Sequence, residues 1–120
     1  MHKKWVETIG KEGEMLKLDE VDLRSFDVSD VLLEQAYLID CNLINVSFYL
    51  TDLSWARLEN IDISVATFEE TLLNGVTLKN IKGIEEAHIK SINIGTLEKP
   101  ILLKSDEAKK WMLEKCEVSF

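Results

Sequence analysis

The chain has few of the residues that interrupt or staple a fold. Its 120 residues include one proline, five glycines, two cysteines and two histidines. No apolar run approaches the ~20 residues that span a membrane, and the first five residues lack the apolar core of a signal peptide. We therefore expect one cytoplasmic domain without membrane contact.

Residue patterns that support catalysis or metal binding are also missing. The sequence has no C-x-x-C or H-x-x-x-H spacing, no glycine-rich phosphate loop and no G-x-S-x-G motif. Two thiols in a cytoplasmic chain argue against a disulfide, and Cys41 is expected to be a small buried apolar side chain. The sequence thus predicts a protein that is not an enzyme and holds no metal or cofactor.

What the sequence does contain is a period of five. Every fifth residue from Leu18 to Leu78 is apolar, and neither an α-helix nor a flat strand produces this spacing. These positions are Leu18, Leu23, Val28, Leu33, Leu38, Leu43, Phe48, Leu53, Leu58, Ile63, Phe68, Leu73 and Leu78. The residue two before each is apolar or threonine, so each unit points two side chains inward and three outward. A short fixed period of this kind indicates a solenoid.

The pattern resembles the pentapeptide-repeat family, whose motif is A(D/N)LXX. The best matches are Val21-Asp22-Leu23, Cys41-Asn42-Leu43, Ala56-Arg57-Leu58 and Ile61-Asp62-Ile63, and the middle position departs from Asp or Asn at Leu32, Tyr37, Arg57 and Leu72. The resemblance implies an all-β fold: a right-handed, four-sided β-helix with twenty residues per coil. Residues twenty apart then stack, which pairs Phe48 with Phe68 and Tyr37 with Arg57.

The expected solenoid spans residues 16–94 in about four coils, each rising by about 4.8 Å. Gly83 interrupts the register, and the spacing resumes one residue late at Ile84, which predicts a bulge at a corner. Residues 1–15 are expected to cover the first coil. Residues 95–120 form a tail with a short helix, for which Ser105 is a candidate N-cap.

The tail helix has two possible roles. Ala108, Trp111, Met112 and Cys116 follow one another at helical spacing. The helix either caps the last coil or pairs two chains into a homodimer, since Trp111 and Met112 are typical interface residues.

Charge is concentrated on the expected solenoid. Residues 16–94 hold fourteen acidic and six basic residues, which accounts for the whole net charge of −8. Nucleic-acid binding is disfavoured, because phosphate contacts need a basic surface, whereas a basic partner is attracted. A candidate acidic face on one side of the solenoid comprises Asp19, Glu20, Asp40 and Glu59.

One coil is unusually apolar on its outside. Five outward positions of residues 36–55 form a candidate protein-contact belt: Ile39, Ile44, Tyr49, Leu50 and Trp55. The alternative is that these side chains are scattered around the four sides and partly covered by their neighbours.

The family resemblance, taken with these patterns, implies two functions of different class. The first is a non-enzymatic protein-interaction module with an unidentified protein partner, as in the adaptor or immunity proteins that small bacterial family members resemble. The second is an acidic DNA mimic, because the quinolone-resistance members of the family are acidic rods that occupy the DNA site of a type II topoisomerase. An enzyme is a weaker third option, since no nucleophile and base are paired.

Overall fold

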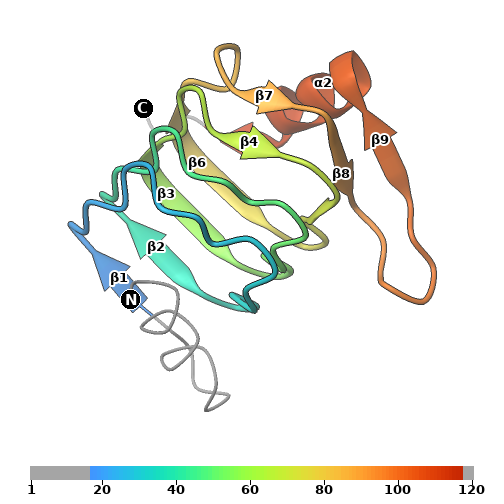
Figure 1. The fold of residues 1–120 in the computed structure, drawn as a ribbon, viewed down its shortest axis with the longest axis horizontal. Helices are drawn as coiled ribbons and strands as arrows, with labels where there is room; N and C mark the ends of the chain where they lie inside the picture. The colour runs from blue at the N-terminus through green and yellow to red at the C-terminus, as the bar shows by residue number, and fades with distance from the viewer. Residues whose placement is uncertain (1–16, 118–120) are drawn as a thin grey trace.

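The protein folds as a β-solenoid of about four turns with one short C-terminal helix, as a computed structural model of residues 17–117 shows (Figure 1). The predicted cap at residues 1–15 lies outside these described residues. Successive coils stack along one direction, from β1 (Lys17–Asp19) at one end to α2 (Ser105–Lys115) near the other.

Twenty residues make one coil, as the sequence predicts. In the largest sheet, Leu18 stands opposite Leu38, Leu38 opposite Leu58, and Leu58 opposite Leu78, all in parallel register. This sheet contains β1, β2 (Tyr37–Ile39), β3 (Arg57–Asp62), β6 (Thr77–Lys82) and β10 (Cys116–Glu117). Two smaller sheets join β4 (Thr67–Phe68) to β7 (His88–Ile89), and β5 (Thr71–Leu72) through β8 (Ser91–Asn93) to β9 (Leu102–Lys104).

The interior is built from the residues of the period-five pattern. All thirteen apolar positions from Leu18 to Leu78 are buried, and so is Cys41. The rings of Phe48 and Phe68 stack with centroids 4.9 Å apart, which confirms the predicted column. The inward hydroxyls of Thr51 and Thr71 donate to backbone carbonyl oxygens of the preceding coil, at 2.8 and 2.7 Å, so these buried polar groups cost little.

Each five-residue unit ends at a corner with an unusual backbone. Every fifth residue from Glu20 to Asn80 has a positive φ, between 49° and 71°. The corner amide donates to the next coil, as from Asp30 to the carbonyl of Tyr49 at 2.8 Å. Asn, Asp and Gly adopt this left-handed conformation most easily, yet the corners also include Leu50, Trp55 and Val65.

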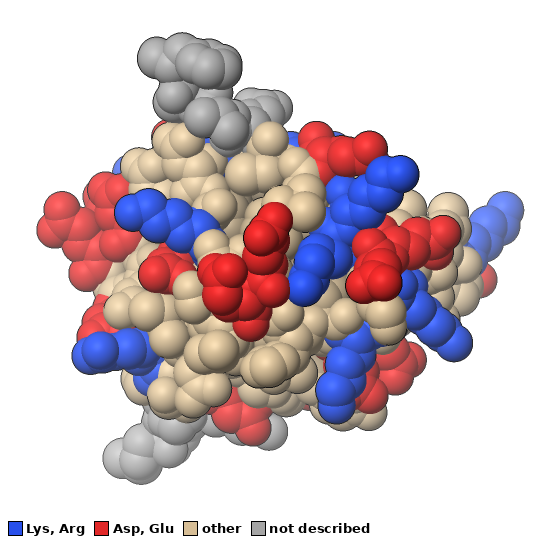
Figure 2. Space-filling view, turned by 90° about the horizontal axis from the view of Figure 1, so that it is seen from above, with Lys and Arg blue, Asp and Glu red and all other residues tan. Residues whose placement is uncertain are grey.

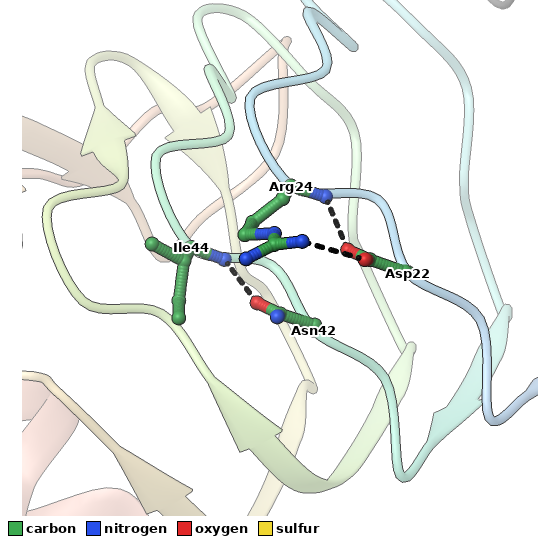
Figure 3. A network of polar contacts seen from close by, with 4 residues as sticks. All are labelled: Asp22, Arg24, Asn42 and Ile44. Carbon is green, nitrogen blue, oxygen red and sulfur yellow. Dashed lines mark hydrogen bonds and ion pairs between the residues drawn. The ribbon is translucent and has the colours of Figure 1, made fainter.

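The Asp or Asn in the middle of the motif closes a turn. In Figure 3, the Asp22 carboxylate accepts the amide hydrogen of Arg24, and the Asn42 side-chain oxygen accepts that of Ile44, both at 3.0 Å. The same bond recurs from Ser54 to Asp52 at 2.9 Å. A short polar side chain that bonds to its own backbone two residues on favours a turn, which explains the residue type in the motif.

The register slips where the sequence predicts. Partners twenty residues apart persist as far as Asp62 and Lys82, but Thr67 pairs with His88, twenty-one residues on. The extra residue is accommodated at Gly83, whose φ is +87°. A Cβ at this position would lie 2.5 Å from the backbone nitrogen of Ser64, so only glycine fits against the coil beside it.

The C-terminal segment departs from the repeat and closes the end of the solenoid. β9 pairs antiparallel with β8, and α2 follows directly. Ala108 and Met112 are fully buried in the same core cluster as the coils. The expected cap at Ser105 is wrong: Lys104 occupies the cap position without a side-chain bond, because Ser105 already belongs to the helix and its amide donates to Lys90 at 3.0 Å.

Candidate functional site

Three of the four residues of the candidate acidic face come together. Asp19 and Glu20 are neighbours in the first coil, and the chain brings Asp40 to the same place one coil later. All three are exposed, and their carboxylate oxygens lie within 4.8 Å of one another. Three like charges this close together provide a local concentration of negative charge.

Glu59, the fourth residue, belongs to a different network. Its Oε2 accepts a hydrogen bond from the Tyr37 hydroxyl at 2.9 Å and lies 3.5 Å from Nε of Arg57. The Tyr37 ring has Lys17 at 5.5 Å and Arg57 at 5.4 Å from its centroid, which confirms the predicted stacking of Tyr37 and Arg57. The hydrogen bond to Glu59, then burial and the negative charge of Glu59, raise the pKa of Tyr37. This network is satisfied within the chain.

A second satisfied array runs along a column of corners. Asn80 donates to the side-chain oxygen of Asn60, and Asn60 donates to the Asp40 carboxylate, each at 3.0 Å. This column, which we call the amide ladder, crosses the large sheet, since Asn60 lies in β3 and Asn80 in β6. Next to it, a shallow groove of about 770 Å³ crosses three coils and is lined by Asp40, Cys41, Asn42, Asn60, Ile61, Asp62, Asn80, Ile81, Lys82 and Cys116.

The groove beside the amide ladder offers little reactivity. Burial raises the pKa of the Cys41 thiol, which keeps it protonated, and the Asp62 carboxylate already accepts hydrogen bonds from Ser64 at 2.9 and 2.6 Å.

The five residues of the candidate belt do not share one strand or one turn. They follow the chain through the successive five-residue units of one coil, from Ile39 in β2 to Trp55. Ile39, Ile44 and Leu50 are half-buried, whereas Tyr49 is 41% and Trp55 is 60% exposed. The two aromatic residues are therefore the members of the belt that a partner can reach.

A second groove lies beside Trp55. It measures about 330 Å³, lies between the coils and the loop that joins β8 to β9, and is lined by Glu34, Asp52, Ser54, Trp55, Leu72, Asn74, Gly95, Thr96, Leu97 and Glu98. Leu72 keeps the outward position of the repeat register, in one column with Leu32 and Asp52, yet it is only 6% exposed. Leu72 pairs with Asn93 of β8, and the loop that follows β8, which the repeat pattern does not include, lines the same groove.

Sequence reasoning missed the loop side of this groove. Leu97 is 77% exposed and lies after the last predicted coil, where no repeat assigns it an inward or outward position. The signal that was available is the short run from Gly95 to Pro100, in which a leucine stands among turn-forming residues.

The helix residues have separate environments. Met112 is 1% exposed and packs into the core of its own chain, so it is not available to a second copy. Trp111 is half-buried, and Nζ of Lys115 lies 5.9 Å from its ring centroid. Homodimerisation through α2 stays a prediction, with Trp111 rather than Met112 as the residue left near the surface.

The fold and its turns define a β-solenoid of five-residue units. Comparison with protein families agrees: residues 17–54 and 29–64 match the model for pentapeptide repeats, in eight copies. Residues 17–64 of this chain are thus pentapeptide repeats. A comparison with curated proteins found no match. No helix among residues 17–117 is long and apolar enough to cross a membrane.

Solved structures of pentapeptide-repeat proteins are similar to parts of this chain. HetL from the cyanobacterium Nostoc, which is involved in heterocyst differentiation regulation, is 29% identical over 65% of this chain, with a TM-score of 0.42. Rfr23 from the cyanobacterium Cyanothece is 31% identical over 63%, with a TM-score of 0.35. QnrB1, a plasmid-mediated fluoroquinolone resistance protein, is 14% identical over 68%, with a TM-score of 0.39. The matches cover only 35%, 54% and 54% of those three proteins.

Proposed function

We propose that this chain is a non-enzymatic protein-interaction module that binds another protein through the side of its solenoid. The observation that supports this function is the exposure of Tyr49 and Trp55 on a coil whose interior is filled by buried apolar residues. Aromatic residues supply much of the binding energy in protein interfaces, and a rigid scaffold lowers the entropy lost on binding. The proposal agrees with the resemblance noted above, because small bacterial members of the pentapeptide-repeat family resemble adaptor or immunity proteins.

The test is capture followed by direct binding. The full chain, immobilised, is exposed to a bacterial lysate, and any enriched protein is then purified and titrated calorimetrically against the free chain. A Tyr49→Ser/Trp55→Asn double variant serves as the matched control, because it removes the exposed rings and leaves the interior unchanged. We expect a saturable one-to-one complex that the double variant weakens at least tenfold. Failure of every captured protein to bind directly overturns the proposal.

The acidic cluster supports a second candidate function, mimicry of DNA toward a type II topoisomerase. Asp19, Glu20 and Asp40 present three carboxylates close together, as phosphates are presented to a basic groove. Figure 2 weakens this candidate for the face that it shows, because acidic groups there are interspersed with Lys and Arg. Mimicry requires a surface of one sign that attracts a basic site over a long range.

A gyrase assay separates the two functions. We expect the wild-type chain to leave the supercoiling activity of gyrase, and its inhibition by a quinolone, unchanged. Mimicry instead predicts protection that weakens as salt rises and that is lost in the Asp19→Asn/Glu20→Gln/Asp40→Asn variant. If the wild type protects gyrase strongly, and this protection weakens with salt and is lost in the triple variant, DNA mimicry replaces protein interaction as the preferred function.

A further inference from the structure

Trp55 occupies a corner whose conformation disfavours it. Its φ is 60°, in the left-handed region that Asn, Asp and Gly adopt more easily, and the corner one coil later is Gly75. The ring is 60% exposed, so burial does not explain its presence. A large side chain held in an uncommon backbone conformation at the surface is a reason to look for a function.

The indole is fixed on one side by the next coil. A Cβ built on Gly75 would lie 2.3 Å from Cε3 of the Trp55 ring, so the ring rests against a backbone without a side chain. This contact limits the positions that the ring can take and leaves its remaining surface to solvent. A ring placed in advance loses little entropy when it binds a ligand.

The opposite wall of the groove is fixed by a buried asparagine. Asn93 in β8 accepts hydrogen bonds from the amides of Gly95 and Ile101, at 2.8 and 3.0 Å, and donates to the carbonyl of Thr96 at 3.3 Å. These three bonds hold the loop that projects beyond the coils in Figure 1 and that exposes Leu97. Trp55 and Leu97 thus line one groove from two separately fixed segments.

Among the residues that the structure describes, the lining of the groove carries negative charge and no basic side chain. Its ten lining residues include Glu34, Asp52 and Glu98, and none of the ten is basic. Glu34 and Glu98 are exposed, and neither forms an ion pair with a residue among 17–117. A groove lined by an aromatic ring, carboxylates and a leucine is complementary to a cation that also has apolar surroundings.

We propose that this surface, the Trp55–Leu97 groove, binds an arginine side chain of a partner protein. The planar guanidinium stacks on the indole and donates hydrogen bonds to the carboxylates of Glu34 and Glu98, while an apolar neighbour of the arginine contacts Leu97. A lysine is a poorer ligand, because its compact ammonium is strongly hydrated and does not stack. A volume of about 330 Å³ holds one or two side chains rather than a large cofactor.

This inference rests on the proposed interaction function and names the chemistry of its partner. The probe is the peptide acetyl-Gly-Leu-Arg-Leu-Gly-amide, titrated into the isotope-labelled full chain and followed by NMR. We expect saturable shifts of the Trp55 indole N–H and the Leu97 amide in the millimolar range. The same peptide with citrulline, which keeps the shape of arginine without its charge, should bind about tenfold more weakly. The lysine peptide should fall between them.

Matched variants locate the site. Trp55→Asn suits the left-handed corner, so the chain should keep its thermal midpoint and lose the peptide. Glu98→Gln should weaken binding about threefold. Val65→Asn is the control, because Val65 is an apolar residue at another left-handed corner that does not line the groove. It should leave the peptide affinity unchanged.

Three results overturn the inference. In the first, Trp55→Asn binds the arginine peptide as tightly as the wild type does; in the second, the citrulline peptide binds as tightly as the arginine peptide. In the third, the Trp55 signal shifts with protein concentration alone, as it does when a second copy of the chain occupies the groove.

Failure of the proposed function has a different signature. If a captured partner binds Trp55→Asn with wild-type affinity, the interaction function stands and the groove is not its site. If the peptide pattern holds but no protein binds directly, the groove is an arginine site and the interaction function fails.

Discussion

Two columns of corner residues share one backbone conformation and use it in opposite ways. Asn60 and Trp55 have φ values of 55° and 60°, and both stand at corners of the solenoid. The side chain of Asn60 is bonded above and below in the amide ladder, at 3.0 Å on each side. Trp55 has Gly75 on one side and is 60% exposed. The backbone at a corner therefore does not depend on the residue that occupies it.

The interior explains this independence. Leu53, Leu58 and their equivalents are buried two residues before each corner, and corner amides bond to the next coil whatever their side chain. Packing and the ladder of backbone hydrogen bonds fix the path of the chain. The side chain at a corner can therefore either bond within its own column, as Asn60 does, or be exposed to a ligand, as Trp55 is. Changes to the interior should consequently have the largest effects.

The first prediction tests the dependence of the corners on the interior. Leu43 is 1% exposed in the middle of the solenoid. Leu43→Asp should abolish the folded state, because an unpaired buried charge costs far more than a lost apolar contact. Leu43→Ala, the control, should cost about 2–5 kcal/mol and stay folded. Circular dichroism with thermal melting checks both, and a cooperative β signal in Leu43→Asp would mean that the register is wrong.

The second prediction concerns the contact between Gly75 and the indole. Gly75→Ala places a Cβ in the space of the Trp55 ring and in a left-handed conformation, and should cost about 2–3 kcal/mol of unfolding free energy. In a Trp55→Asn background only the backbone term of about 1–2 kcal/mol should remain. Urea unfolding of the four proteins in this cycle measures the coupling. Strictly additive effects would show that the ring does not rest on Gly75.

The sequence predicts the repeated part of this protein well because its information is local and redundant. All thirteen apolar positions are buried in the same way, so each one indicates the period independently. Departures from Asp or Asn at the middle position of the motif, such as Arg57 or Leu32, therefore do not hide it. The one-residue slip at Gly83 is visible for the same reason. Coil length follows from residue columns such as Phe48 and Phe68.

The surface is less predictable, because it depends on contacts between segments outside the repeat. Nothing in the local pattern indicates that the loop after Asn93 lines a groove with Leu72, or that Glu59 bonds to Tyr37 rather than joining Asp19. The five belt residues share a coil in sequence, yet only Tyr49 and Trp55 are well exposed. Period alone says which side chains point outward but not what lies over them.

The third prediction exchanges residues between the two kinds of corner. Val65→Asn replaces a β-branched residue at φ of 49° with one that tolerates it, and should stabilise the protein by about 0.5–1 kcal/mol. Asn60→Val does the reverse and also breaks two bonds of the amide ladder, so it should cost about 1–2 kcal/mol. Thermal melts measure both. Opposite signs would mean that side-chain packing, not backbone strain, determines corner preferences.

The smallest expected effect concerns the closed network beside the amide ladder. The Tyr37 hydroxyl donates a hydrogen bond to the Glu59 carboxylate, so deprotonation of Tyr37 removes this bond and places two negative charges side by side. The pKa of Tyr37 should therefore lie above its ordinary value of 10.0. Since the folded-state pKa is raised, the stabilisation from this bond is present below pH 10.0 and is lost as pH rises through the folded-state pKa. Titration of the Tyr37 ring carbons by NMR checks the direction of this pKa shift.

Two variants serve as the comparison. Glu59→Gln should lower the pKa of Tyr37, whereas Glu34→Gln, at an exposed acid in the Trp55–Leu97 groove, should leave it unchanged. A Tyr37 pKa that does not respond to Glu59→Gln would show that this network is not closed in solution and that Glu59 remains available to the acidic face.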